Sequence, residues 1–254
     1  LRRTLGLKLK KKNVFPGNLR GDIPVLHAYS ARISPAPGDW ADNNIITGFW
    51  RLDDASGWTP PPAFEAFLSK GEAPVYLGFG SMSFGAQRNT EIITRALKLW
   101  GGRAVIGKGW GGVKEEALPE SVFVIDRAPH TELFKYVKAV VHHGGAGTTY
   151  AGLYAGRPSF AVPQFCYQPY WGQLLYELGS RKRRVRLRKL KPQILAGALD
   201  DLASTPAYAR AAEALGEKLK LEDGTNLAVD VIEETIASYD ARPPHDQELL
   251  GVAS

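Results

Sequence analysis

The sequence predicts an α/β domain built on a doubly wound parallel sheet with helices on both faces, and three observations support this. From residue 74 onward, short apolar segments alternate with segments of helical spacing. The apolar segments are continuous, as expected for strands covered on both faces. Glycine or proline follows several of them and marks turns. Repeated strand–helix–strand units of this kind favour a parallel sheet.

The expected elements follow in chain order. Strands are expected at residues 74–79, 103–106, 121–125, 138–141 and 159–162, and helices at residues 90–100, 131–136, 146–154 and 170–178. Beyond residue 192 we expect three further helices, at residues 193–202, 206–221 and 226–239. Ligands bind such sheets at the carboxyl ends of the strands. The loops after the five strands are therefore the expected site.

The segments outside this pattern complete the expected domain organisation. We expect the domain itself over residues 63–239, a Pro-, Gly- and Trp-rich connecting segment packed on it over 25–62, a basic N-terminal remnant or linker at 1–24 and a flexible tail at 240–254. No apolar run reaches the roughly 18 residues of a membrane-spanning helix, and the start lacks the apolar part of a signal peptide. The lone Cys166 excludes an intramolecular disulfide. A cytoplasmic location is expected.

The net charge of +6 comes from two basic runs. Residues 1–12 carry six basic side chains and residues 181–191 carry eight, with no acid in either. The rest of the chain has 18 basic and 26 acidic residues and is therefore net negative, which argues against a general polyanion-binding surface. We interpret the run at 181–191 first as a solvent-facing edge strand before a helix at Pro192. The alternative is peripheral contact with an anionic membrane surface. No nucleic acid is expected, because no aromatic residues are interleaved.

The loop after the fourth strand has the pattern of an anion site. It reads His142-His143-Gly144-Gly145-Ala146-Gly147-Thr148-Thr149 and enters a helix. Amides of a first helical turn point outward, the helix dipole favours negative charge, and glycine lets a phosphate approach the backbone. The alternative is a turn whose glycines only permit packing. No lysine follows the glycines, so the loop is not a Walker A motif, and it does not have the spacing of a dinucleotide-binding fingerprint either.

Together with other segments, this loop resembles the donor-binding signature of UDP-glycosyltransferases of the GT-B fold, and in particular the sterol glucosyltransferases and their bacterial relatives. The further matching motifs are Thr47-Gly48-Phe49-Trp50, residues 74–82, Gly109-Trp110-Gly111-Gly112, residues 129–134, Ala155-Gly156-Arg157-Pro158, residues 162–163 and residues 168–171. The similarity spans residues 25–238. It implies a Rossmann-like domain that is the C-terminal, donor-binding half of a two-domain enzyme.

The resemblance also implies a role for individual residues. The donor diphosphate is expected on His143, Gly145, Ala146, Gly147, Thr148 and Ser81, the uracil on Arg127 and Ala128, and the sugar on Gln168. Arg127 could instead be a solvated surface charge. We interpret His130 as the structural start of a helix, Trp110 as a core or interface aromatic, and His142 as structural, since neighbouring strand residues point to opposite faces. No cofactor and no metal are expected, and the UDP-sugar is a substrate.

Two features qualify the implied function. Tyr167 stands where the family usually has an aspartate that holds sugar hydroxyls, so glucose is only the first expectation for the hexose. The family's general base lies in an N-terminal acceptor-binding domain that we do not find here, so no catalytic residue is assigned to this chain, which is expected to bind UDP without transferring sugar. The acceptor expected for the whole enzyme is a hydroxyl of a lipophilic molecule such as a sterol. The alternatives are a non-catalytic nucleotide-sugar-binding module and a natural-product glycosyltransferase that uses dTDP-sugars.

Overall fold

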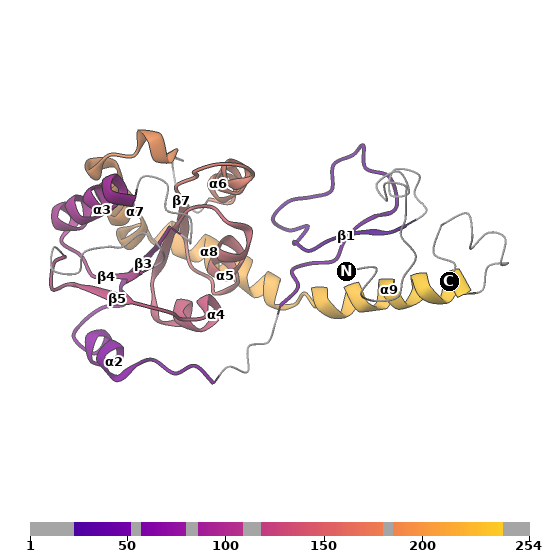
Figure 1. Cartoon of the computed structure of the whole chain (residues 1–254), viewed down its shortest axis with the longest axis horizontal. Coiled ribbons are helices and arrows are strands. Elements are labelled where there is room, and N and C mark those ends of the chain that lie inside the picture. The colour runs from indigo at the N-terminus through magenta and orange to yellow at the C-terminus, as the bar shows by residue number, and fades with distance from the viewer. Residues whose placement is uncertain (1–22, 52–56, 80–85, 109–117, 180–184, 241–254) are drawn as a thin grey trace, which may run out of the picture. The chain divides into compact units, whose positions relative to one another are not determined.

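A computed structural model of the chain describes residues 23–51, 57–79, 86–108, 118–179 and 185–240 (Figure 1). The chain divides into two compact units, one of residues 53–221 and one of residues 1–52 together with 222–254. The division differs from the expected single domain over residues 63–239, because the last helix groups with the N-terminal segment.

The larger unit is built on a five-stranded parallel sheet with the strand order β5-β4-β3-β6-β7. Its strands are β3 (Val75–Gly78), β4 (Ala104–Gly107), β5 (Val122–Ile125), β6 (Ala139–His142) and β7 (Ser159–Ala161). All five predicted strands are thereby confirmed. Every side chain of β3 and β6 is buried, which explains why these segments read as continuous apolar runs.

Helices cover both faces of this sheet (Figure 1). The unit contains α2 (Pro62–Leu68), α3 (Ala86–Trp100), α4 (His130–Leu133), α5 (Ala146–Tyr154), α6 (Gln168–Glu177), α7 (Pro192–Ser204) and α8 (Pro206–Lys220), with short 3-10 turns η2 (Phe134–Tyr136) and η3 (Leu187–Lys189). Two apolar cores result. One packs Leu77 of β3 against α3 and α7, and the other packs the adjacent Tyr76 against α2 and α4.

Two of these elements differ from the expectations. Helix α2 was not predicted, and it buries Phe64 and Phe67 in the second core. The edge strand expected at residues 181–191 is wrong for its described part, which forms η3 between two extended residues, although α7 does begin at Pro192. Val185 and Leu190 are buried there, so the alternation of charged and apolar residues reflects anchoring to the core.

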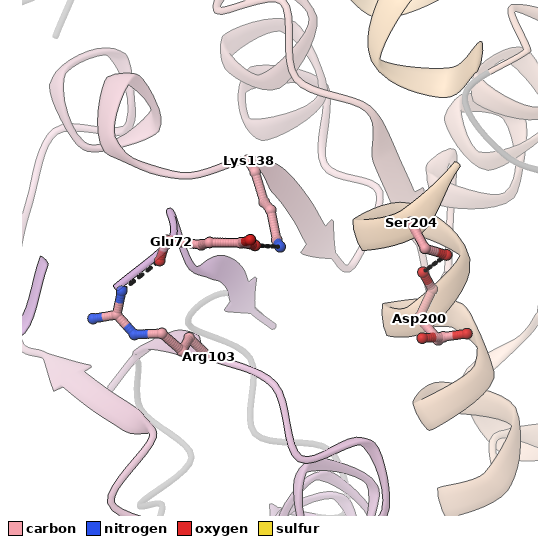
Figure 2. A network of polar contacts seen from close by, with 5 residues as sticks. All are labelled: Glu72, Arg103, Lys138, Asp200 and Ser204. Atoms are coloured by element: carbon pink, nitrogen blue, oxygen red, sulfur yellow. Dashed lines mark hydrogen bonds and ion pairs between the residues drawn. The ribbon is translucent and has the colours of Figure 1, made fainter. Parts of the chain in front are cut away.

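Side chains tie together the amino ends of the central strands (Figure 2). The Arg103 guanidinium, just before β4, donates to the carbonyl oxygens of Glu72 and Phe67 and lies 4.3 Å over the Phe67 ring. Lys138, just before β6, donates to the Glu72 carboxylate at 3.1 Å. Three segments that precede neighbouring strands are thus joined. A separate hydrogen bond, from Ser204 Oγ to the Asp200 carbonyl at 2.7 Å, lies in the last turn of α7.

The smaller unit contains a two-stranded parallel sheet and a long helix. Strand β1 (Val25–His27) pairs with β2 (Asn44–Ile46), and α9 covers Gly224–Asp240. Ser30 Oγ donates to Glu222 at 2.7 Å, which ties the strand segment to the start of the helix. The two short strands were not predicted from the connecting segment. No helix in the described part of the chain is long and apolar enough to span a bilayer.

Candidate functional site

The loop between β6 and α5 presents unpaired backbone donors. Gly144 has a φ of +87°, a conformation that glycine adopts without strain, and Gly145 precedes the helix without any side-chain cap. The amide of Thr149 makes the first helical bond, to the Gly145 carbonyl at 2.9 Å. The amides of residues 146–148 therefore have no helical acceptor, and no described residue accepts from them. This is the geometry of an anion-binding helix start.

The glycines of this loop have distinct roles. A Cβ on Gly145 would lie 2.5 Å from Nε2 of His143, and one on Gly144 would lie 2.9 Å from the carbonyl oxygen of Gln168. Both positions therefore exclude side chains because their neighbours pack against the backbone. A Cβ on Gly147 would meet nothing within 4 Å. That position is open toward the surface, so packing within the chain gives no reason for its glycine.

A pocket of about 550 Å³ opens at the carboxyl ends of the strands beside this loop. Its lining joins the end of β6, the loop after β5 and the ends of β3 and β4. The predicted residues in the lining are Arg127, Ala128, His143 and Thr148; the others are Trp58, Tyr76, Gly78, Gly107, Ile125, Asp126, Pro129, His130 and Leu133. The structure thus brings two separately predicted groups to one cavity, of the size usual for small-molecule sites.

Burial favours the uncharged form of the two histidines that line the pocket. Burial lowers the pKa of His143, and an interaction with the Gly78 backbone acts in the opposite direction. Burial also lowers the pKa of His130, with the charge of His143 as a second cause. Each neutral ring has one N–H donor and one acceptor nitrogen, so His143 would offer a phosphate a neutral donor rather than a positive charge.

His142 is fully buried and stabilises the loop from within. The Gly144 amide donates to Nδ1 of His142 at 3.0 Å, which places the proton of the neutral ring on Nε2. That Nε2 is buried and has no partner among the described residues. Burial, followed by the charges of His143 and His130, lowers the pKa of His142 to about 3. The prediction that His142 is structural and points away from the pocket-lining His143 agrees with this arrangement.

Tyr76 forms part of the pocket floor and was missed from the sequence. Its hydroxyl lies 3.2 Å from Nε2 of His130, and burial raises the pKa of Tyr76 to about 12. A Cβ on Gly78 or Gly107 would lie 2.3 or 2.5 Å from that hydroxyl. Glycines at the ends of two adjacent strands therefore make room for one ring. Gly78 and Gly107, at the ends of two expected strands, were the sequence signal that could have indicated a bulky neighbour such as Tyr76.

The remaining predicted residues lie at different places. Arg127 is exposed at the mouth of the pocket, near a 3.1 Å ion pair between Lys108 and Asp126. Gly145, Ala146 and Gly147 form the start of α5 next to the pocket but do not line it. Ser81 and Trp110 lie outside the described residues. His130 begins α4, as predicted, and also lines the pocket.

The Gln168 side chain is engaged in its own loop. Its Oε1 accepts the amides of Gln164 at 2.8 Å and Phe165 at 3.2 Å, and the residue is buried. Gln168 thereby fixes the loop that leads into α6, and its oxygen has little capacity left for a ligand. Tyr167 beside it is 59% exposed, so the phenol, rather than the amide, faces outward here. In the described residues no group of three or more His, Cys, Asp or Glu side chains could hold a metal ion.

Comparison with known proteins identifies relatives of this arrangement. Residues 111–233 match the family described as "Erythromycin biosynthesis protein CIII-like, C-terminal domain". A sterol 3-beta-glucosyltransferase of Arabidopsis thaliana is 37% identical over 227 residues, which are 88% of this chain and 36% of the relative. The chain therefore spans about a third of that relative's length.

Two solved structures show the same fold. The glycotransferase of kitacinnamycin superposes with a TM-score of 0.68 at 24% identity, over 84% of this chain and 54% of the other. Arabidopsis thaliana UGT89C1, solved with UDP, superposes with a TM-score of 0.57 at 22% identity, over 74% of this chain and 51% of the other. These likenesses concern the arrangement of the strands and helices.

Proposed function

The chain belongs to the family 1 glycosyltransferases of the GT-B fold, of which it carries the C-terminal domain, and on this premise we propose that its pocket binds the donor, a UDP-sugar. The observation that carries the proposal is the start of α5, where three free amides and the neutral His143 lie beside a pocket of nucleotide size. The diphosphate would lie against these donors.

The base would occupy the loop after β5. Ala128 and Arg127 line the pocket there, and the apolar Ile125 and Leu133 line it as well. A backbone amide and carbonyl at Ala128 can pair with the edge of a uracil, and the exposed Arg127 guanidinium can lie over its face. Ser81, at the end of β3 by sequence, is proposed as a further phosphate contact.

The sugar-binding side of the site is proposed from Tyr167 and Gln168. The Gln168 oxygen is engaged by two amides, so its Nε2 and the exposed Tyr167 hydroxyl are the groups proposed to meet the sugar. Glucose is the proposed hexose. The second candidate donor is a dTDP-sugar, favoured by the solved glycosyltransferase VinC in complex with dTDP, which superposes with a TM-score of 0.54 at 22% identity.

In the transfer reaction the acceptor hydroxyl would displace the diphosphate at the anomeric carbon. The α5 amides, His143 and the Thr148 hydroxyl would stabilise the negative charge that develops on the departing diphosphate. A sterol or another lipophilic alcohol is the proposed acceptor, because the Arabidopsis thaliana relative is named for that activity. The relative is longer, so the acceptor site and the general base are proposed to lie in a separate acceptor-binding domain. By the same reasoning the 254 residues bind UDP without transferring sugar.

Calorimetric titration of the purified chain tests the donor assignment. We expect UDP to bind at least about tenfold more tightly than uridine, because the charge-assisted bonds of the diphosphate exceed about 1.4 kcal/mol together. His143→Ala should remove most of that difference, while His27→Ala, in the smaller unit, should leave it unchanged. Equal affinity for uridine and UDP would contradict the proposal.

Competition with UDP-glucose, UDP-galactose and dTDP-glucose then identifies the donor. Stronger competition by dTDP-glucose would replace UDP by dTDP in the proposal. A Tyr167→Asp variant that gains preference for UDP-glucose would place sugar selection at that position. A turnover assay with a sterol acceptor, run on the same chain, would contradict the binding-only assignment if it detects transfer.

A further inference from the structure

The larger unit has a second pocket, which shares no lining residue with the proposed donor pocket and has a different chemistry. It has a volume of about 600 Å³. Four cationic residues line it, Arg186, Arg188, Lys189 and Lys191, and all four are exposed. Its other lining residues are the buried or half-buried Pro163, Pro169, Val185 and Ile194. We call this cavity, with its apolar floor and basic rim, the basic pocket.

The backbone that carries these cations is held in place. Val185 and Leu190 are anchored in the apolar core on the α3 and α7 side of the sheet. The Leu187 amide donates to the Pro163 carbonyl at 3.0 Å, which fixes η3 to the end of β7. Arg88 of α3 donates to the carbonyls of Leu187 and Leu190 at 3.4 and 3.3 Å. The four cations therefore extend from a fixed turn.

The described part of the chain supplies these cations with no counter-charge. None of the four forms an ion pair with a carboxylate in the described ranges. Four positive charges within six residues repel one another, and water and salt screen part of that repulsion. No carboxylate within the described residues offsets that repulsion, so these charges remain available to an external anion.

We propose that the basic pocket binds the phosphate head group of an anionic phospholipid. Clustered Lys and Arg side chains bind phosphate oxygens, and arginine does so in a bidentate geometry. The apolar floor would contact the glycerol and the first acyl carbons, for which a free phosphate has no counterpart. The ligand would lie against Pro163 and Pro169, which flank the loop that carries Tyr167 and Gln168.

The proposal deepens the proposed function, because it gives an enzyme with a lipid acceptor a specific contact with the membrane. Only the biological reason for such a contact, a lipid acceptor in the membrane, depends on the proposed function. The contacts that carry it, which are the four cations, the apolar floor and the fixed η3 turn, do not involve the donor pocket.

Vesicle co-sedimentation of the full chain tests the proposal. The chain should sediment with phosphatidylcholine vesicles that contain phosphatidylinositol phosphate and remain in solution with phosphatidylcholine alone. Arg186→Glu/Arg188→Glu should lower the partition coefficient about tenfold or more, since two cations that attract the anionic surface become anions that it repels. The matched control, Arg95→Glu/Lys98→Glu, makes the same charge change on exposed α3 positions outside both pockets and should retain most of the binding.

The remaining outcomes are decisive. Equal losses in the two double variants would overturn the proposal, because general positive charge, including the unchanged run at residues 1–12, would then explain the binding. If calorimetry shows that soluble inositol phosphate binds while the chain does not sediment with vesicles, the pocket is a site for a free anion, and the assignment to a phospholipid is overturned. UDP titration of the same variants separates the two sites: unchanged UDP affinity with lost vesicle binding supports a lipid site independent of the donor site.

Discussion

The two ends of the five-stranded sheet are built on opposite principles. At the amino end, Arg103, Glu72 and Lys138 satisfy one another and the nearby carbonyls (Figure 2). At the carboxyl end, the amides at the start of α5 and Nε2 of His142 have no partner among the described residues. One end therefore contributes stability through closed contacts. The other leaves polar groups without partners in the fold, which costs stability. The α5 amides are the groups proposed to meet the donor, whereas Nε2 of His142 is buried and does not line the pocket.

Removing the guanidinium at the amino end should have the largest effect. We expect Arg103→Met to lower the free energy of unfolding by about 3 kcal/mol, because a charged donor to two carbonyls and a cation–π contact are lost together. UDP affinity should stay unchanged. Urea unfolding and calorimetry measure the two quantities. Arg95→Met, at an exposed position of α3, is the control and should stay within about 0.5 kcal/mol of the parent chain. A comparable loss in both variants would mean that the Arg103 contacts contribute little.

Acid should destabilise the carboxyl end through His142. Burial lowers the pKa of this histidine to about 3 in the folded chain, against 6.5 for an ordinary histidine, so in acid the unfolded chain binds a proton that the folded chain does not bind. Stability is therefore complete above pH 6.5 and falls as the pH decreases toward 3. From this residue alone we expect a loss of about 2 kcal/mol between pH 7 and pH 5.

Urea unfolding at several pH values measures this slope. His142→Gln should flatten it by about that amount, while the lowered pKa values of His130 and His143 contribute a slope of the same sign that remains. An unchanged slope in His142→Gln would show that the buried imidazole is not the group responsible.

Filling the open position of the α5 start should separate binding from stability. A Cβ on Gly147 meets nothing in the chain, so Gly147→Ala should raise stability by up to about 1 kcal/mol through helix propensity. It should also weaken UDP binding about tenfold, because the methyl group would occupy the space proposed for the phosphate. Gly197→Ala, which also meets nothing within 4 Å and lies within α7, is the matched control for stability. Undiminished UDP affinity in Gly147→Ala would place the diphosphate elsewhere.

The smallest effect is expected from the exposed ion pair. The Glu72 side chain is 87% exposed, so its pairing with Lys138 is weak in water. Glu72→Gln should cost less than about 1 kcal/mol and leave the Arg103 contact intact, because Arg103 uses the Glu72 carbonyl and not its carboxylate. Thermal unfolding at low and high salt checks this. A larger loss would assign the amino end's stability to the ion pair instead.

Much of the larger unit followed from the sequence because its signals are local. Continuous apolar runs identified the five strands, and the glycine-rich loop identified the start of α5. The prediction of an edge strand at 181–191 was wrong because it also relied on a local pattern. A turn anchored at Val185 and Leu190 produces the same alternation of charged and apolar residues as a strand does. The short strands β1 and β2 were missed, since three residues each leave little periodicity to detect.

The sequence by itself determined the order of the strands and helices along the chain and the glycine-rich loop at the start of α5, because each depends on neighbouring residues. Only the tertiary structure decided that Tyr76 and His130 meet across the pocket floor, that the Gln168 oxygen is occupied by its own loop, and that four cations surround a cavity. Those facts depend on distances between residues far apart in the chain, which packing fixes and local pattern does not encode.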